Sequence, residues 1–157
     1  MAATVVYLDA SALVKRYVAE PGSAEVRDFL PRATVLGTAA ITRVEVAAAL
    51  AKAMRIRLLS QEGATAALRA FEQDWEALER LQVSELMLTR AAHLAWEHGL
   101  RSYDATHLAA ALVWHEVLGE PVTVATFDRQ LWEAARTSGL APWPAAPPRA
   151  PGPPAPR

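Results

Sequence analysis

The chain is 157 residues long, carries a formal net charge of -1 and contains no cysteine. The absence of cysteine excludes a disulfide scaffold, a thiolate zinc site, an iron–sulfur cluster and a cysteine nucleophile. The balanced charge argues against a protein that holds nucleic acid through overall basicity. No apolar run approaches the roughly 18 residues of a membrane span, and the N-terminus lacks a signal-peptide pattern, so we expect a cytoplasmic protein without a membrane partner.

Proline is distributed unevenly along the chain. Eight of the 11 prolines lie beyond residue 140. This bias predicts one folded domain over residues 1–140 and a Pro-rich, extended or disordered tail over residues 141–157. When Arg149 and Arg157 of the tail are set aside, the domain carries 14 basic and 17 acidic residues, so its charge is mildly acidic.

The first half of the chain combines short apolar strands with amphipathic helices. The predicted elements are strands at 4–8 and 34–36, helices at 12–18, 23–30 and 42–58, and a further helix that ends at 81. Ser60–Gly63 separates the last two helices. Because these two helices lie between strands, we expect them to form a protruding hairpin.

The second half continues the alternation of strands and helices. The predicted elements are strands at 82–84 and 122–125 and helices at 86–98, 102–118 and 128–136. The strands are short apolar runs without a clean alternation of polar and apolar residues. Strands of this kind, alternating with helices, predict an α/β fold with a buried, mainly parallel sheet.

Four acidic residues lie where strands give way to helices or in the first turn of a helix: Asp9, Glu45, Asp104 and Asp128. Each has a structural explanation, since acids complement the helix dipole and cap free N–H groups. Thr42 and Glu45 have the spacing of a capping box. The four acids have a further explanation when they are considered together. Helices that follow parallel strands begin at one edge of the sheet, where ligands bind. The four carboxylates can therefore converge.

Converging carboxylates repel one another unless a cation lies between them. An all-oxygen set of ligands favours Mg²⁺ or Mn²⁺, and the lack of cysteine and of paired histidines makes zinc a poor match. A cation in such a site supports phosphodiester hydrolysis. Ser11 and Thr126 each lie two residues from one of these acids, so their hydroxyls can position a carboxylate or cap a helix.

The segments around these acids resemble the PIN-domain ribonucleases, specifically the VapC toxins of bacterial and archaeal toxin–antitoxin pairs. The matching segments occur in the family's order at residues 6–15, 41–46, 103–111 and 125–128. The resemblance implies an α/β/α sandwich and a Mg²⁺- or Mn²⁺-dependent endoribonuclease. It also implies a small VapB-like antitoxin as partner, and a homodimer. By motif position, Asp9, Glu45, Asp104 and Asp128 are the catalytic and metal-binding acids, and Ser11 and Thr126 are the accessory hydroxyls.

RNA binding requires positive charge that the overall balance does not supply. The nearest candidates are Lys15, Arg16, Lys52, Arg55 and Arg57, which can contact phosphates or simply keep helix surfaces soluble. We expect His107 to support the site or to pack beside it, because it lies one turn after Asp104.

Other functions remain open from the sequence. A phosphatase of the haloacid dehalogenase type requires a second aspartate two residues after the first, where this chain has Ser11. A PIN nuclease outside a toxin–antitoxin system, or a PIN-like module that binds RNA or a partner without cutting it, is the alternative to a toxin.

Overall fold

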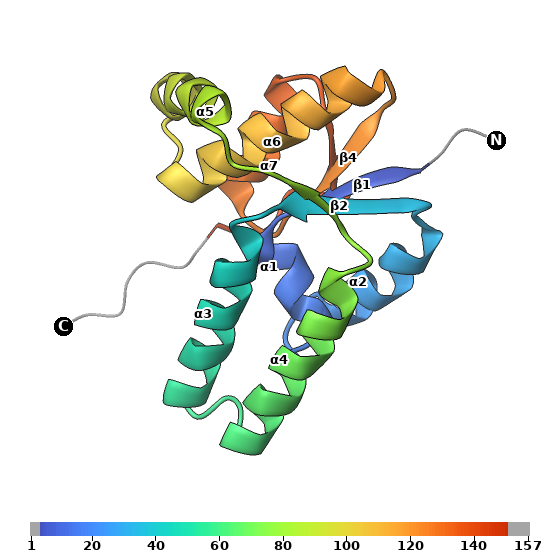
Figure 1. Cartoon of the computed structure of the whole chain (residues 1–157), viewed down its shortest axis with the longest axis vertical. Helices are drawn as coiled ribbons and strands as arrows, with labels where there is room; N and C mark the ends of the chain where they lie inside the picture. Colours follow the sequence, from blue (N-terminus) through green and yellow to red (C-terminus); the bar gives the residue numbers. More distant parts are fainter. Residues whose placement is uncertain (1–3, 151–157) are drawn as a thin grey trace.

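Five strands form one parallel sheet at the centre of the molecule (Figure 1). The computed structural model describes residues 4–150. The strands are β1 (Val5–Leu8), β2 (Val35–Ala39), β3 (Glu79–Leu81), β4 (Val122–Ala125) and β5 (Ala141–Trp143), in the spatial order β3-β2-β1-β4-β5. Every neighbouring pair is parallel, so all five strands end at the same edge.

Helices cover both faces of the sheet and make the three-layer sandwich that the family resemblance implies. The helices are α1 (Ala10–Leu13), α2 (Ser23–Phe29), α3 (Thr42–Arg55), α4 (Gln61–Trp75), α5 (Glu85–His98), α6 (Ser102–Leu118) and α7 (Arg129–Thr137), with short 3-10 turns at Val14–Arg16 and Leu30–Arg32. The α/β prediction is therefore confirmed. Among residues 4–150, no helix has both the length and the apolarity needed to cross a membrane.

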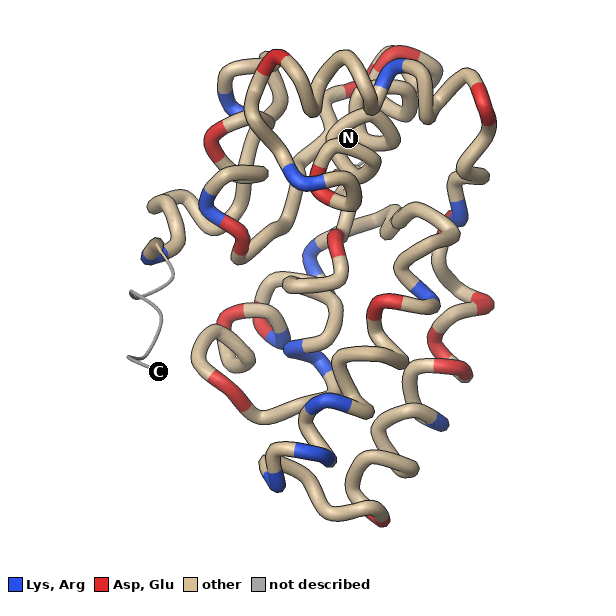
Figure 2. Tube along the Cα trace, turned by 90° about the vertical axis from the view of Figure 1, so that its left-hand side faces the viewer, with Lys and Arg blue, Asp and Glu red and all other residues tan. Residues whose placement is uncertain are grey.

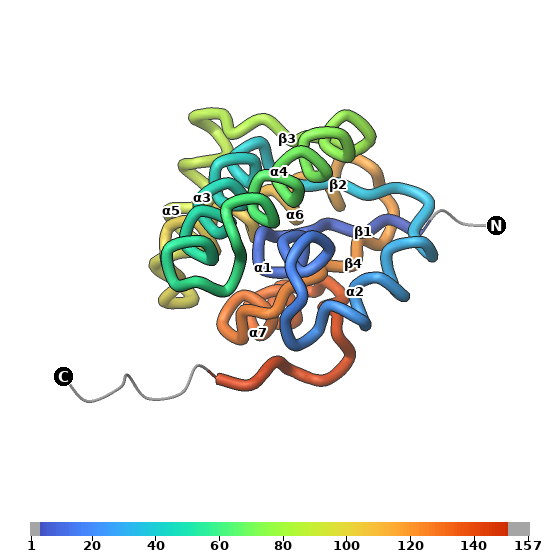
Figure 3. The backbone as a smooth tube through the Cα atoms, turned by 90° about the horizontal axis from the view of Figure 1, so that it is seen from below, coloured from blue at the N-terminus to red at the C-terminus, as the bar shows by residue number. Residues whose placement is uncertain are grey.

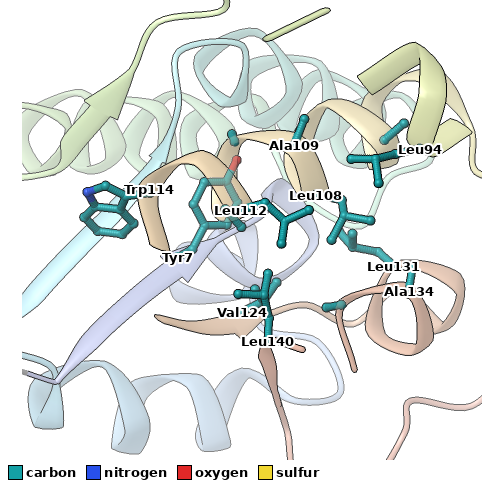
Figure 4. Close-up of a cluster of buried hydrophobic side chains, with 14 of the residues drawn as sticks. Tyr7, Leu94, Leu108, Ala109, Leu112, Trp114, Val124, Leu131, Ala134 and Leu140 are labelled. Carbon is teal, nitrogen blue, oxygen red and sulfur yellow. The ribbon is translucent and has the colours of Figure 1, made fainter. Parts of the chain in front are cut away.

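The side chains of β1 divide the core into two halves because successive residues of a strand point to opposite faces. Val5 and Tyr7 pack against α5, α6 and α7, in the cluster shown in Figure 4. Val6 and Leu8 pack on the other face, against α1, α2, α3 and α4. Burial on both faces explains why β1 is continuously apolar and lacks polar alternation.

Helices α3 and α4 project from the sandwich as an antiparallel hairpin, as the sequence predicts (Figures 1 and 3). The hydroxyl of Ser60 caps α4 by accepting a hydrogen bond from the Gly63 N–H at 3.0 Å. Phe71 and Trp75 at the end of α4 are buried against the sheet, so the root of the hairpin belongs to the core while its tip extends into solvent.

The boundary between α4 and the next strand differs from the prediction. The helix ends at Trp75, and β3 occupies Glu79–Leu81, where the sequence pattern predicts the end of a helix and a strand only at 82–84. The strand pairs with Gly37–Ala39 of β2, and the Ala40 N–H extends the pairing by donating to the Leu81 carbonyl at 2.8 Å. Backbone pairing at the sheet edge thus outweighs the helical spacing of Leu78 and Leu81.

The domain also extends beyond its predicted end at residue 140. Ala141–Trp143 forms β5, which pairs with β4. Pro142 is tolerated because β5 lies at the edge of the sheet, where a missing N–H costs no ladder bond. The Trp143 ring stacks on Phe29 with centroids 4.0 Å apart, which ties the strand to the core. Residues 144–150 follow as irregular chain, and the predicted character of residues 151–157 lies outside the described part.

Candidate functional site

The carboxyl edge of the sheet brings together acids from four separate segments. Asp9 directly follows β1, and Asp128 follows β4 and begins α7. Glu45 lies in the first turn of α3, and Asp104 in the first turn of α6. The charges of Asp9, Glu45 and Asp104 all act on His107, and the charge of Asp128 acts on Asp104. The structure therefore places all four sequence-predicted acids in one electrostatic cluster.

Asp9 is the most deeply buried of these acids, with 3% of its surface exposed. One carboxylate oxygen accepts from the Ser11 hydroxyl at 2.7 Å and from the Ala12 N–H at 3.0 Å, and the other accepts from the Thr126 hydroxyl at 2.8 Å. Burial raises the pKa of Asp9, although the positive charge on His107 and these hydrogen bonds oppose the rise. The carboxylate is thus held in a fixed orientation at a considerable desolvation cost.

Ser11 and Thr126 link the β1 and β4 ends of the site. The Ser11 hydroxyl also accepts from the Phe127 N–H at 2.8 Å, and the Thr126 hydroxyl accepts from the Asp128 N–H at 3.0 Å. The two hydroxyls therefore position a carboxylate and shape the turn before α7, which combines the two roles that the sequence leaves open.

Glu45 does not form the capping box with Thr42 that their spacing allows. The N-cap of α3 is Ile41, without a side-chain hydrogen bond, and Thr42 is fully buried. Glu45 Oε1 instead lies 2.6 Å from Nε2 of His107, whose Nδ1 lies 2.7 Å from the Tyr7 hydroxyl. Burial lowers the pKa of His107, but the hydrogen bond to Glu45 and the surrounding carboxylates outweigh it and raise that pKa. His107 therefore supports the site from beneath, as expected for its position.

Tyr7 completes this chain of hydrogen bonds and is not evident as a site residue from the sequence, because it looks like an ordinary core aromatic. Both Tyr7 and His107 are almost wholly buried, so the loss of either partner leaves a polar atom without water.

Replacement of Tyr7 by Phe is expected to lower the free energy of unfolding by about 1–3 kcal/mol, because Nδ1 of His107 loses its buried partner. Tyr17→Phe provides the matched control: the Tyr17 hydroxyl is only partly buried, and its acceptor Asp74 keeps an ion pair with Arg16. Urea denaturation of both variants measures the difference. An equal or smaller loss for Tyr7→Phe would contradict the proposed support of His107.

Arg101 is a site residue that the sequence analysis missed. Its guanidinium donates to Oδ2 of Asp104 at 3.0 Å and to Oδ2 of Asp128 at 2.8 Å. Burial and the charge of Asp128 raise the pKa of Asp104, and Arg101 opposes that rise. The sequence offers one signal for Arg101: it lies three residues before Asp104, across the start of a helix. Its contact with Asp128 depends on the fold and has no local signal.

The donor chemistry of the cluster fits a hard divalent cation. All four acids offer oxygen ligands, and burial raises the pKa of Asp9 and of Asp104, so a bound cation would offset the cost of keeping both carboxylates charged. With the side chains arranged as they are, residues 4–150 contain no group of three or more acidic or histidine side chains close enough to hold a metal ion. Arg101 and His107 occupy oxygens of three of the four acids.

A family model, a curated relative and solved structures all relate this chain to PIN-domain proteins. The PIN domain family matches residues 6–137. Ribonuclease VapC45 of Mycobacterium tuberculosis (strain CDC 1551 / Oshkosh) is 35% identical over 136 residues, covering 86% of this chain and 92% of the relative. Two solved structures share the fold. VapC20 of M. tuberculosis, a Sarcin-Ricin loop cleaving toxin, has a TM-score of 0.64 at 16% identity and covers 91% of this chain and 99% of its own. A toxin–antitoxin complex from Klebsiella pneumoniae has a TM-score of 0.52 at 15% identity, and the match covers 75% of this chain and 83% of the chain in that complex.

Proposed function

Because this chain belongs to the PIN-domain family and is related over most of its length to VapC ribonucleases, we propose that it is a metal-dependent endoribonuclease acting as the toxin of a toxin–antitoxin pair. The observation that carries the proposal is the meeting of Asp9, Glu45, Asp104 and Asp128 at the carboxyl edge of the sheet. Asp9 and Asp128 also cap α1 and α7, but capping does not account for Glu45 and Asp104, whose carboxylates contact His107 and Arg101 instead.

The proposed cofactor is Mg²⁺, with Mn²⁺ as a substitute. Asp9 and Asp104 would be its main ligands, with Glu45 and Asp128 completing the acidic set. Such an ion supplies a lowered pKa for a coordinated water and offsets negative charge on the phosphate. The raised pKa values of Asp9 and Asp104 support this proposal, because burial makes both charged carboxylates costly and a bound cation would stabilise them.

The protein itself supplies orientation. Ser11 and Thr126 bind different oxygens of Asp9 and prevent the carboxylate from rotating. His107 holds one oxygen of Glu45 and is fixed in turn by Tyr7. Preorganised ligands of this kind avoid the cost of reorganisation when substrate binds.

Positive charge for RNA is available on the α3–α4 hairpin. Lys52, Arg55 and Arg57 are exposed near the free end of α3, and within residues 4–150 none of them forms an ion pair. Figure 2 shows basic residues gathered toward that end. Lys15 and Arg16 are less available, because they pair with Glu20 and Asp74. The hairpin is therefore our candidate for phosphate contacts outside the acidic site.

The proposed partners are an RNA substrate, a small VapB-like antitoxin and a second copy of the chain, with the cytoplasm as the place of action. The toxin–antitoxin complex with the same fold supports the antitoxin. Trp96 on α5 is 93% exposed, which is unusual for a large apolar side chain and supports a protein contact.

The purified chain without antitoxin should cleave RNA internally in the presence of Mg²⁺ or Mn²⁺. Chelation by EDTA should stop cleavage, and an excess of either ion should restore it. Fragments from 5′- and 3′-labelled RNA distinguish internal cuts from exonuclease trimming. The Asp104→Asn variant, purified in parallel, reports any contaminating nuclease. Cleavage that survives EDTA, or that the variant retains in full, would contradict the proposal.

A further inference from the structure

One cation already lies within the acidic site, and it is the guanidinium of Arg101. The Nε group contacts Asp104 of α6, and an NH2 group contacts Asp128 at the start of α7. A single positive charge thus joins two of the four acids. Burial and the charge of Asp128 raise the pKa of Asp104, and Arg101 reduces that rise.

We propose that Arg101 is a displaceable counter-cation: it neutralises Asp104 and Asp128 in the metal-free protein, and a divalent cation must displace it to use these carboxylates. The exchange sets the cation concentration at which the enzyme becomes loaded. This inference rests on the cation site of the proposed function and adds a positioning residue that controls its occupancy.

The attachment of Arg101 to the fold permits such an exchange. Arg101 directly precedes α6, and its side chain is 73% exposed, so its departure removes no core packing. The Asp104 and Asp128 side chains are only 12% and 22% exposed, but the guanidinium reaches them from solvent, so a dissolved cation can compete with it. Arg101 and Asp128 also line an open hollow of about 300 Å³, with Gln130 and Glu133, which gives the released side chain room beside the site.

The effect of removing Arg101 distinguishes a counter-cation from a permanent scaffold. The guanidinium takes the Oδ2 atoms of both Asp104 and Asp128, so it occupies oxygens of two of the four carboxylates that we propose as ligands. If Arg101 only ordered these carboxylates, its removal would weaken metal binding. If it competes with the ion, its removal strengthens metal binding.

The test is titration of the metal-free full chain with Mn²⁺, with free Mn²⁺ measured by electron paramagnetic resonance and no RNA present. Arg101→Gln, which keeps a polar side chain without the charge, should bind Mn²⁺ about tenfold more tightly than the unaltered protein. Arg101→Lys should fall between them, because one ammonium group cannot reproduce the forked contact. The rise in melting temperature on adding Mn²⁺ should also be larger for Arg101→Gln.

Arg129→Gln is the matched control. Arg129 borders the same hollow, but its guanidinium pairs with Glu133 and not with an acid of the site. Its loss removes the same unit of charge nearby, and we expect less than about a threefold change in Mn²⁺ affinity because solvent screens the interaction.

Three results would overturn the inference. Equal or weaker Mn²⁺ binding by Arg101→Gln, with binding by the unaltered protein intact, would refute the counter-cation role alone. Equal gains in Arg101→Gln and Arg129→Gln would show a general charge effect and refute it as well. Failure of the unaltered protein and of Arg101→Gln to bind Mn²⁺ would refute the proposed cation site together with the inference.

Discussion

Replacement of Asp9 by Asn is expected to reduce RNA cleavage by at least about a thousandfold while making the metal-free protein more stable. Activity falls because a neutral amide is a poor ligand for a hard cation. Stability rises because the substitution removes a buried charge whose pKa is raised by desolvation. A gain of about 2–5 °C in melting temperature is the expected size for a protein of this length.

The pH dependence of this gain in stability follows from the raised pKa of Asp9. The folded protein binds a proton at Asp9 more tightly than the unfolded chain does, so Asp9 favours folding at low pH, and that contribution is lost as pH rises through its raised pKa. The stability advantage of Asp9→Asn should therefore be largest at neutral pH and should shrink on acidification. Melting curves of both proteins across this range, without metal, measure the difference.

Asp28→Asn is the control for the Asp9 prediction, since Asp28 lies exposed on α2, away from the carboxyl edge of the sheet. This variant should keep full activity and an unchanged melting temperature. Retention of cleavage by Asp9→Asn would remove Asp9 from the site, and a large loss of stability would show that its charge supports the fold.

Truncation after Leu140 is expected to lower the free energy of unfolding by about 3 kcal/mol, the lower end of the range for removal of a large aromatic side chain from a core, because Trp143 is only partly buried. The deletion removes β5 and the stacking of Trp143 on Phe29. It also removes the Pro144 carbonyl, which accepts from the indole N–H of Trp132 at 2.7 Å.

The same truncation should weaken catalysis, because β5 holds a residue of the site. The Thr126 N–H donates to the Trp143 carbonyl at 3.0 Å, and the Thr126 hydroxyl donates to Asp9. Truncation after Ala146 keeps all of these contacts and should leave stability and cleavage unchanged. Urea denaturation and RNA cleavage of the two truncated chains test the prediction, and equal stability would show that the domain ends at residue 140.

Much of the site follows from local sequence signals. A buried apolar strand followed by an acid locates Asp9, and an acid in the first turn of a long helix locates Asp104. Parallel strands share an edge, so the convergence of the acids is predictable once the alternation of strands and helices is recognised. The support role of His107 follows from its position one helical turn after Asp104.

The remaining features depend on contacts between distant segments. Glu45 has a local partner in the capping-box pattern, but His107, 62 residues away, binds it instead. Arg101 reaches Asp128 only because α6 and α7 begin at the same edge of the sheet. Proline-rich composition hides β5, since its strand character comes from pairing with β4 and from the stack on Phe29.

The most direct test of the central claim is anomalous diffraction from crystals of the full chain soaked in Mn²⁺. The proposed site predicts an anomalous peak between the carboxylates of Asp9 and Asp104, with the Arg101 guanidinium withdrawn from Asp104. An empty site with Arg101 still bound to both acids, or a peak only at another position, would contradict the claim that these carboxylates hold the ion.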